Sequence, residues 1–507
     1  MKSGSTHRSS TAAAPASASA PALLSASSAG PTIALASSTG HCLASASTAG
    51  AAPASASKAT PANAFMPASA HANAFMPASA HANAFMPVSA PASACGLESA
   101  TAASGSTDKA APLALRSLEL FCGAGGLALG LRQAGFAHEG LFERDSDCCR
   151  NIADNIQRGC PLTENWKIFR RDVREIDWLE MGFKAGELAL ISGGPPCQPF
   201  SVGGRAKACD DARDMFPEAV RAVRQLQPQA FVFENVQGLL RPAFASYFKY
   251  ILLQLTWPSL VRKPDQNWEQ HLHDLKAHDE GSHGSAEYQV AYRLYNAADF
   301  GVPQVRQRVF ITGIRADLNM APELPEPTHA KEALLYSKWG DGSYWQRHGL
   351  KKPTVSDINI MAINKVSRFV QDNPHIKPWC TVRDAIGDLP CPLSPEAAAC
   401  NSHEFRAGAR AYAGHTGSLP DAPSKTIKAG VHGVPGGENM ITLDDGSLRY
   451  FTVRESARIQ TFPDDYHFHS SWTESMRQIG NAVPVMLAAA VGRTIFSVLS
   501  RADRSHS

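Results

Sequence analysis

The chain has 507 residues, a length that favours roughly two to four domains, and its formal net charge is only +2. This balance gives no general attraction to nucleic acid, so any nucleic-acid surface must be a local basic patch. We find no run of about 18 apolar residues free of polar breaks and no basic-then-apolar secretory signal, so we expect no membrane association. The 11 cysteines lack the spacing of metal ligands, which is typical of a reduced, cytoplasmic chain without a metal site.

Residues 1–111 are dominated by Ala, Ser, Pro and Thr and carry few charges. A ten-residue unit repeats three times in this segment, with Asn-Ala-Phe-Met-Pro starting at Asn63, Asn73 and Asn83. Each unit contains proline and is shorter than the roughly 20 residues of a repeat architecture. Because such a composition buries too little apolar surface to offset the entropy of ordering, we predict a disordered tail. A short linear motif for a partner is the alternative.

The first half of the body predicts a Rossmann-like α/β sheet. An apolar strand at 115–121 leads into the glycine-rich turn 123–126 and then a helical pattern. This order is typical of a nucleotide-binding unit, although many α/β turns need glycine for backbone conformation alone. A second strand ends at Glu143, and a third acidic tip follows at Asp172. Such carboxylates can bind the hydroxyls of a nucleoside, or serve only as solvated charges and helix caps.

The fourth predicted strand, at 188–191, runs into a loop in which Pro195 and Pro196 precede Cys197. Two consecutive prolines stiffen the loop and direct the next side chain. That side chain lies at the carboxyl edge of the sheet, where α/β folds place their ligands. A cysteine without such surroundings is more often an inert buried residue. The rigid approach and the neighbouring glycine turn favour a reactive thiol here.

Two further segments add charged residues to the same fold. The apolar strand 230–236 contains the carboxylate of Glu234 near its end. Arg306 and Arg308 stand two residues apart at the start of a later strand, a spacing that places both on one face. A solvated strand edge is the alternative. The His-rich stretch 265–285 is read as a solvated polar insertion, because its spacing matches no familiar metal site.

Together these segments resemble the DNA cytosine-5 methyltransferase family. The matching blocks follow the family's order over residues 115 to about 498, and they are 120–126, 194–201, 234–236, 304–308, 454–463 and 478–484. The Pro-Pro-Cys-Gln block followed by Glu-Asn-Val is highly specific. The resemblance implies a Rossmann-like S-adenosylmethionine-dependent methyltransferase domain with a smaller, loop-rich target-recognition domain.

The resemblance also implies roles for individual residues. Cys197 is expected to attack carbon 6 of cytosine, Glu234 to act at N3, and Arg308 to hold the base oxygen, with Arg306 as a less certain partner. S-adenosylmethionine is expected to contact these residues: Phe121, Gly123, Gly125, Glu143, Asp172, Pro196, Asn481 and Val483. One departure stands at Arg144, where some relatives carry an aromatic residue that stacks on adenine. Cys122 is the one competitor for the role of nucleophile, but it lacks the proline approach.

We expect four regions: the tail at 1–111, a catalytic domain at 112–315, a target-recognition domain at 316–450 and a C-terminal part at 451–500 that returns to the catalytic domain as a helix. The recognition domain is loop-rich around 430–439, and Lys425 and Lys428 suit phosphate contacts. The implied partner is double-stranded DNA, from which the target base is flipped. A restriction endonuclease is an expected functional partner. We expect a monomer in the cytoplasm, associated with the nucleoid.

Three alternatives remain at this stage. A relative that methylates transfer RNA shares the chemistry, although the sizeable recognition region favours DNA. A relative that only binds is disfavoured by the intact Cys197, Glu234 and Arg308. An amino-group methyltransferase of DNA would need an acidic-Pro-Pro-aromatic motif, which this sequence lacks.

Overall fold

The computed structural model describes residues 115–196, 214–282, 286–354, 360–411, 416–430 and 439–505. All of these belong to one compact unit within residues 89–507. The predicted tail at 1–111, Cys197 and most of the glycine-rich segment 430–439 lie outside the described residues.

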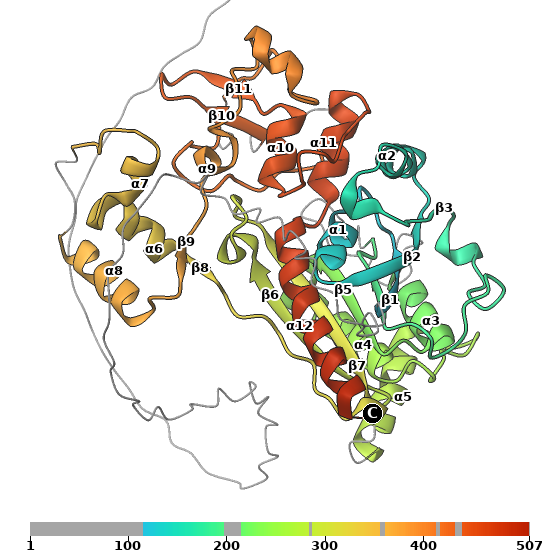
Figure 1. Cartoon of the computed structure of the whole chain (residues 1–507). Coiled ribbons are helices and arrows are strands. Elements are labelled where there is room, and N and C mark those ends of the chain that lie inside the picture. The colour runs from blue at the N-terminus through green and yellow to red at the C-terminus, as the bar shows by residue number, and fades with distance from the viewer. Residues whose placement is uncertain are drawn as a thin grey trace, which may run out of the picture. The chain divides into compact units, whose positions relative to one another are not determined.

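The described chain is organised around a seven-stranded sheet with the order β3-β2-β1-β4-β5-β7-β6 (Figure 1). β1 to β5 are parallel to one another, whereas β7 runs antiparallel to both β5 and β6. The strand order reverses between β1 and β4, and open α/β sheets bind ligands at the carboxyl ends of strands beside such a point. The predicted Rossmann-like fold is confirmed. The strands are β1 Leu115–Leu120, β2 Phe136–Glu143, β3 Ile168–Arg170, β4 Leu190–Gly193, β5 Ala230–Val236, β6 Tyr288–Asn296 and β7 Gln307–Arg315.

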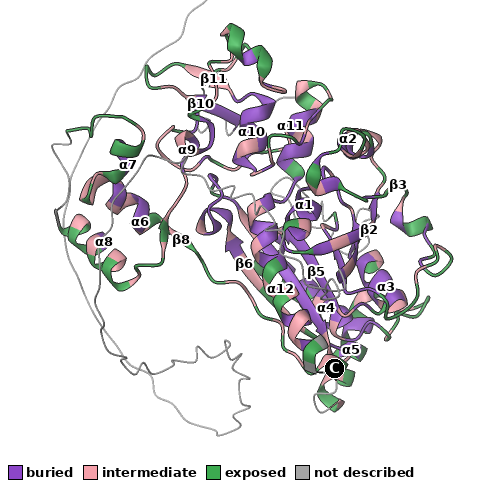
Figure 2. Cartoon of the chain, viewed as in Figure 1, coloured by how far each residue is buried: buried purple, intermediate pink, exposed green. Residues whose placement is uncertain are grey.

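Helices cover both faces of the sheet because its strands are apolar on both sides (Figure 2). In β5, Ala230 and Val232 join one hydrophobic cluster, while Phe231 and Phe233 join another, as the alternation of a strand requires. The first cluster contains α1 and α12, and the second contains α3, α4 and α5. The helices around the sheet are α1 Gly126–Gln133, α2 Ser146–Gln157, α3 Phe216–Leu226, α4 Ala245–Thr256, α5 Trp268–Gly281 and α12 Val485–Ser505.

The C-terminal part of the chain contains the helix α12. α12 packs along α1, and a β-carbon on Gly130 would overlap the side chain of Ala488. By length and hydropathy alone, the helical stretch Trp472–Ala502 could cross a membrane, with a mean hydropathy of 1.8 in its most apolar window. Since 67% of that window is buried inside the structure, packing in the protein core also explains its apolar residues.

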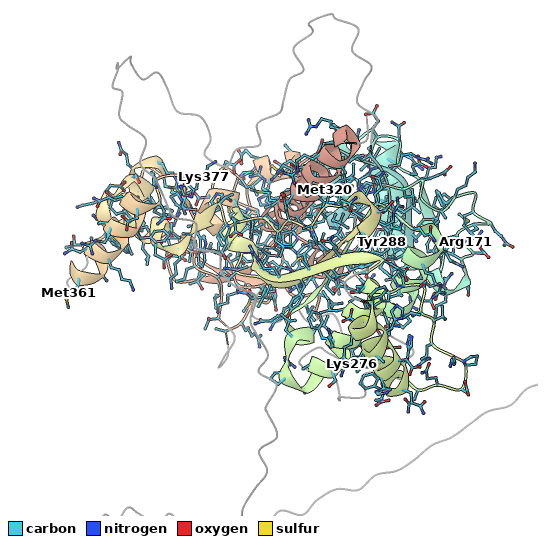
Figure 3. The ribbon with its side chains drawn as sticks, turned by 90° about the horizontal axis from the view of Figure 1, so that it is seen from below. Arg171, Lys276, Tyr288, Met320, Met361 and Lys377 are labelled. Carbon is cyan, nitrogen blue, oxygen red and sulfur yellow. The ribbon has the colours of Figure 1, made fainter. Side chains whose placement is uncertain are left out.

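The interpretation of 265–285 as a solvated polar insertion is wrong for one face of α5. Leu272 and Leu275 are buried in the core with α4, and a capping box at Asn267 begins the helix. His271 is buried too, and its two ring nitrogens contact the Tyr250 hydroxyl at 2.9 Å and the Leu260 carbonyl at 3.1 Å. The opposite face is exposed, including Lys276 (Figure 3).

The region after β7 consists of short elements. Leu334, Tyr344 and Trp345 form a small separate cluster in its first half. Residues from 382 onward join a larger cluster with α1, α10 and α11, so no change of core marks the expected boundary at 450. The division into 316–450 and 451–500 stays a prediction. The elements are β8 His329–Ala330, α6 Lys331–Leu335, α7 Ser343–Arg347, α8 Ile360–Asp372, β9 Lys377–Pro378, α9 Val382–Ile386, β10 Met440–Thr442, β11 Leu448–Tyr450, α10 Val453–Ile459 and α11 Trp472–Asn481.

Candidate functional site

The glycine-rich turn after β1 has an unusual backbone. Phe121, Gly123 and Gly125 adopt positive φ values of 57°, 53° and 79°, a region that glycine occupies without strain. A β-carbon built on Gly123 would have no heavy atom within 4 Å, so open space adjoins the turn at this point. The turn therefore offers backbone groups to a ligand at the carboxyl edge of the sheet.

The two predicted acidic tips lie at the same edge. Glu143 ends β2, and one of its oxygens accepts a hydrogen bond from the Gly123 amide at 3.0 Å. Its other oxygen accepts from the amides of Arg144 and Asp145, each at 2.9 Å. The oxygen that accepts from Gly123 has a second lone pair, so Glu143 can still accept a bond from a ligand.

Asp172 follows β3 and caps a short 3₁₀ helix by accepting from the Arg174 amide. Its carboxylate also pairs with the Arg174 guanidinium at 2.5 Å and lies 3.7 Å from that of Arg144. These arginines lower the pKa of Asp172 to about 2, with the Arg174 hydrogen bond as the largest cause. Arg144 thus reaches across from one acidic tip to the other, an arrangement that the sequence did not predict.

The segment after α11 borders the glycine turn. A β-carbon on Gly126 would overlap the carbonyl oxygen of Val483, whereas Asn481 is exposed. Tyr466 is fully buried, and its hydroxyl donates a 2.8 Å hydrogen bond to the carbonyl of Ala124 within the turn. Sequence reasoning missed Tyr466, because its partner lies 342 residues away and the pattern around it gives no signal.

The proline loop, Glu234 and Arg308 meet at the ends of β4, β5 and β7. Arg308 Nε lies 2.7 Å from Glu234 Oε1, and both side chains are nearly buried. A β-carbon on Gly194 would stand 3.4 Å from the other Glu234 oxygen. The Asn235 side-chain amide donates to the Pro195 carbonyl at 3.0 Å, which ties β5 to the loop. The loop thus reaches Pro196, an exposed residue directly before Cys197, beside this ion pair.

The electrostatics of Glu234 suit a carboxyl group that can hold a proton. Burial raises its pKa, while the charges of Arg308 and then Arg306 oppose that rise. A buried carboxyl with a raised pKa can act as a general acid near neutral pH.

Arg306 does not share the position of Arg308. It lies before β7 rather than within it, and its side chain is fully buried. Its terminal nitrogens donate to the backbone carbonyls of Ile427, Gly480 and Ala482. The expectation that the two arginines act as neighbours on one strand face is therefore wrong, because the tertiary packing supplies Arg306 with these partners.

Glu119 is a second buried carboxyl that sequence reasoning missed. It is 1% exposed in β1, and the Ser192 hydroxyl of β4 donates to it at 3.2 Å. Burial raises its pKa to about 8, and hydrogen bonds from Ser192 and the Ala128 amide oppose the shift. Glu119 therefore joins the first turn of α1 to the strand that leads into the proline loop.

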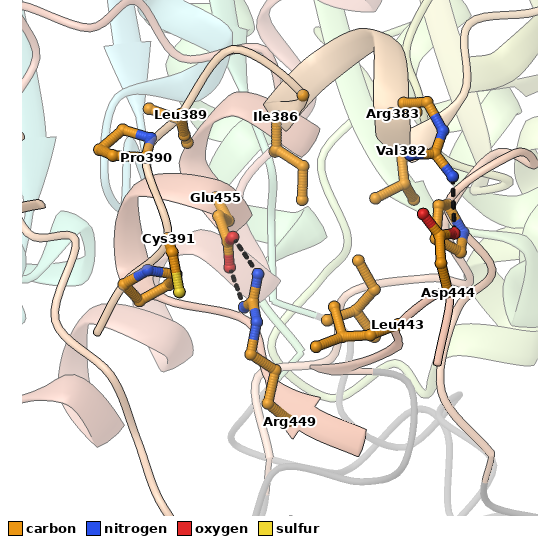
Figure 4. Close-up of a pocket in the computed structure, with 14 residues that line it drawn as sticks. Val382, Arg383, Ile386, Leu389, Pro390, Cys391, Leu443, Asp444, Arg449 and Glu455 are labelled. Atoms are coloured by element: carbon orange, nitrogen blue, oxygen red, sulfur yellow. Dashed lines mark hydrogen bonds and ion pairs between the residues drawn. The ribbon is translucent and has the colours of Figure 1, made fainter. Parts of the chain in front are cut away.

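A cavity of about 230 Å³ lies elsewhere, between α9, β10, β11 and α10 (Figure 4). Apolar side chains line it, and ion pairs between Arg449 and Glu455 and between Arg383 and Asp444 stand at its rim. No predicted site residue lines this cavity. Within the described ranges, one group of carboxylates could hold a cation, formed by Asp145, Asp147 and Glu474, and Arg477 already pairs with the first and the last.

Comparison with known proteins agrees with this geometry. A family model described as C-5 cytosine-specific DNA methylase matches residues 115–257 and 281–497, and its gap at 258–280 contains most of α5. The chain is 29% identical over 389 residues to type II methyltransferase M.NgoMIV of Neisseria gonorrhoeae, which covers 76% of this chain and 98% of the relative. It is 30% identical over 395 residues to M.PspPI of Psychrobacter sp. (strain TA137), which covers 76% and 80%. With its mixed sheet, proline loop and buried Glu234–Arg308 pair, the chain belongs to the family of C-5 cytosine-specific DNA methylases.

Proposed function

We propose that the protein transfers a methyl group from S-adenosylmethionine to carbon 5 of a flipped-out cytosine in a specific double-stranded DNA sequence, through a covalent adduct with Cys197. The observation that carries this proposal is the ion pair between Glu234 and Arg308, which lies beside the Gly194–Pro196 approach to the cysteine. Two groups of the expected chemistry, Glu234 and Arg308, thereby lie beside the segment that leads to Cys197.

The chemical difficulty is that carbon 5 of cytosine is a poor nucleophile. The Cys197 thiolate forms a bond to carbon 6, and the electron pair of the 5,6 double bond becomes available at carbon 5. Protonated Glu234 donates to N3 and disperses the negative charge of the ring. Arg308 holds the base oxygen and orients the carboxyl group. Carbon 5 uses this electron pair to bond the methyl group, and S-adenosylhomocysteine is the leaving group. A solvent base then takes the carbon 5 proton, the 5,6 double bond forms again as the carbon–sulfur bond breaks, N3 returns its proton to Glu234 and Cys197 is released as thiolate.

Cys122 is a poor candidate for the same role. It is 6% exposed within the glycine turn, and burial, together with the nearby Glu143 and Glu119, raises its pKa well above the ordinary value. A thiol held in its protonated form is not an effective nucleophile. The rival nucleophile is thus disfavoured on electrostatic grounds as well as by its position.

The turn and the acidic tips fit S-adenosylmethionine, which supplies an electrophilic methyl group when bound. The open space at Gly123 admits a ligand against the backbone, and Glu143 keeps acceptor capacity for ribose hydroxyls. Phe121, Gly125, Asp172, Pro196, Asn481 and Val483 are the other residues we propose to line the pocket. We propose that Asp172 binds the adenine amino group and that Arg144, 3.7 Å from Asp172, offers a guanidinium where some relatives stack an aromatic ring.

The substrate side rests on the region after β7. Lys425 and Lys428 are exposed next to the buried Ile427, and we propose that they contact phosphates. The proposed biological role is protection of host DNA against a cognate restriction endonuclease, in the cytoplasm at the nucleoid, by a monomer that needs no metal. The type II methyltransferase names of M.NgoMIV and M.PspPI support this role.

A duplex with 5-fluorocytosine at the target tests the chemistry. Fluorine cannot leave carbon 5 as a proton does, so the enzyme should stay bonded to the DNA in the presence of S-adenosylmethionine. The adduct should survive denaturing electrophoresis and map to Cys197. Bisulfite sequencing of a naive host genome after expression identifies the target sequence first.

Cys197→Ala should abolish trapping and turnover while DNA binding persists, because phosphate contacts do not need the thiol. Cys122→Ala is the matched control and should still form the adduct. A trapped peptide that contains Cys122, or full activity of Cys197→Ala, would overturn the mechanism. Methylation of transfer RNA without methylation of DNA would favour the alternative substrate.

A further inference from the structure

Three fully buried polar side chains form a cluster, Gln304, Arg306 and Gln460, that we call the buried clasp. Each has 0% exposure. Gln304 and Arg306 precede β7, and Gln460 directly follows α10. All three bond to other parts of the protein, although Arg308, for which we propose the base oxygen, is only two residues away from Arg306.

Arg306 donates to carbonyl groups from two distant parts of the chain. Its Nη1 contacts the carbonyl of Ile427 at 2.9 Å, and its Nη2 contacts those of Gly480 at 2.7 Å and Ala482 at 3.0 Å. A planar guanidinium serves these acceptors from two rigidly spaced nitrogens, whereas an ammonium group has a single donor nitrogen. Arg306 therefore sets the distance between the segment around Ile427 and the turn after α11.

The two glutamines complete the same connection. The Gln460 amide donates to the carbonyls of Ile479 at 2.6 Å and Ala482 at 3.1 Å. The Gln304 amide donates to Gln460 Oε1 at 2.9 Å, and Gln304 Oε1 accepts from the Ile427 amide at 2.8 Å. Both the amide and the carbonyl of Ile427 are thus held by the clasp.

The joined segments have different proposed partners. Ile427 stands between Lys425 and Lys428, for which we propose DNA phosphates, and Ala482 stands between Asn481 and Val483, for which we propose S-adenosylmethionine. We infer that Arg306 is a positioning residue that couples the binding of DNA to the binding of S-adenosylmethionine, by fixing both segments to the strand that carries Arg308. This inference rests on the proposed function.

The electrostatics agree with a role inside the protein. Burial and the charge of Arg308 lower the pKa of Arg306, and the Glu234 carboxylate opposes that shift. The buried guanidinium is therefore costly unless its carbonyl partners remain in place. A displacement of either segment by a ligand would change these contacts, which is the physical basis for coupling between the two sites.

The test uses the full-length protein, S-adenosylhomocysteine as the cofactor probe and a duplex with the identified target sequence. Calorimetry measures the dissociation constant of S-adenosylhomocysteine with and without saturating duplex, and the ratio is the coupling factor. Arg306→Lys removes donors to the two segments. We therefore expect the coupling factor of this variant to be at least about 5-fold closer to one than that of the wild type. The KM values for both substrates should rise by a similar factor, while kcat stays within about 3-fold of wild type.

Two variants make the result specific. Arg315→Lys changes an arginine at the far end of β7 that pairs with Asp317, and it should leave the coupling factor and all kinetic constants unchanged. Gln304→Met removes the contacts of the clasp to Gln460 and Ile427 without a change in charge, and it should reproduce the Arg306→Lys pattern. It decides the question if Arg306→Lys does not fold.

A coupling factor equal to that of wild type would overturn the inference, and so would a fall in kcat with unchanged KM values, which would place Arg306 at the reacting base. If the wild-type protein neither methylates the duplex nor binds S-adenosylhomocysteine, the proposed function fails instead.

Discussion

Gly126 lies against Val483, so closely that any β-carbon on Gly126 would overlap the Val483 carbonyl oxygen. Gly123, three residues earlier, faces open space instead. The two glycines of one turn therefore have different reasons to lack a side chain. Gly126 allows the turn to approach the C-terminal segment, and Gly123 leaves room beside it.

This difference predicts opposite phenotypes for two alanine variants. Gly123→Ala should cost only about 1–2 kcal/mol of unfolding free energy, from its positive φ, but it should weaken S-adenosylhomocysteine binding by at least tenfold because the methyl group enters the proposed pocket. Gly126→Ala should lose more unfolding free energy than Gly123→Ala, since the Val483 backbone must move to admit the methyl group. Denaturant unfolding and calorimetry measure both quantities. Unchanged cofactor affinity in folded Gly123→Ala would remove this turn from the pocket.

Replacement of Glu234 should affect the chemical step. We expect Glu234→Gln to lower kcat by about 10²–10⁴-fold, the usual range for a general acid, with little change in DNA affinity. Because burial raises the pKa of Glu234, the protonated acid persists to higher pH, and the wild-type kcat should fall on the alkaline side as pH rises through that pKa. The Gln variant should lack this limb in single-turnover measurements. A variant with wild-type kcat would exclude the carboxyl group from the reaction.

Glu119 should make stability depend on pH. Its pKa is about 8 in the folded protein and ordinarily 4.5, so the folded protein holds a proton on Glu119 more tightly than the unfolded chain does. The resulting stabilisation is fully present below pH 4.5 and is lost as the pH rises through 8. Relative to Glu119→Gln, wild type should lose at most about 1.4 kcal/mol per pH unit between these values. Parallel urea titrations from pH 5 to about pH 8.5 check this, and a difference that does not vary with pH would contradict it.

The helix α5 should contribute to the core. Leu275→Ala should lower the free energy of unfolding by about 2–4 kcal/mol, because Leu275 is fully buried against α4. Lys276→Ala, on the exposed face of the same helix, should stay within about 0.5 kcal/mol of wild type. Equal effects of the two substitutions would show that the helix does not pack as described.

Removal of residues 1–108 should leave methylation in vitro nearly unchanged. The composition of this segment offers little to a core, and the family match begins at residue 115. Rates of full-length and truncated protein on the same duplex test this expectation. A large loss of activity in folded truncated protein would reveal a role for the Asn-Ala-Phe-Met-Pro repeats.

The sheet could be predicted from the sequence because its signals are local. The strand expected at 230–236 is β5, and the strand expected to end at Glu143 is β2. β5 has the apolar run 230–233 before Glu234, and β2 has Leu141 and Phe142 before Glu143, patterns that depend only on neighbours in the chain. Local patterns also place Glu234 and Arg308 each on a strand, whereas their assignment to one site follows from the family resemblance.

Other features could not be predicted so easily. The partners of Arg306 lie 121 to 176 residues further along the chain, so no pattern around Arg306 reveals them. α5 did carry a local signal, since Trp268, Leu272 and Leu275 have helical spacing and Asn267 begins a capping box. The many histidines and charges of the stretch obscured that signal.

One consequence concerns the order of the motifs along the chain. Leu115, at the start of β1, belongs to the same hydrophobic cluster as Val498 and Leu499 near the end of α12. In a circular permutant, a short linker would join these two ends, and new termini would lie in an exposed loop. Every strand of the sheet would keep the same neighbours. Circularly permuted versions should therefore fold and methylate, because the active site depends on which strands lie side by side and not on the order in which the ribosome makes them.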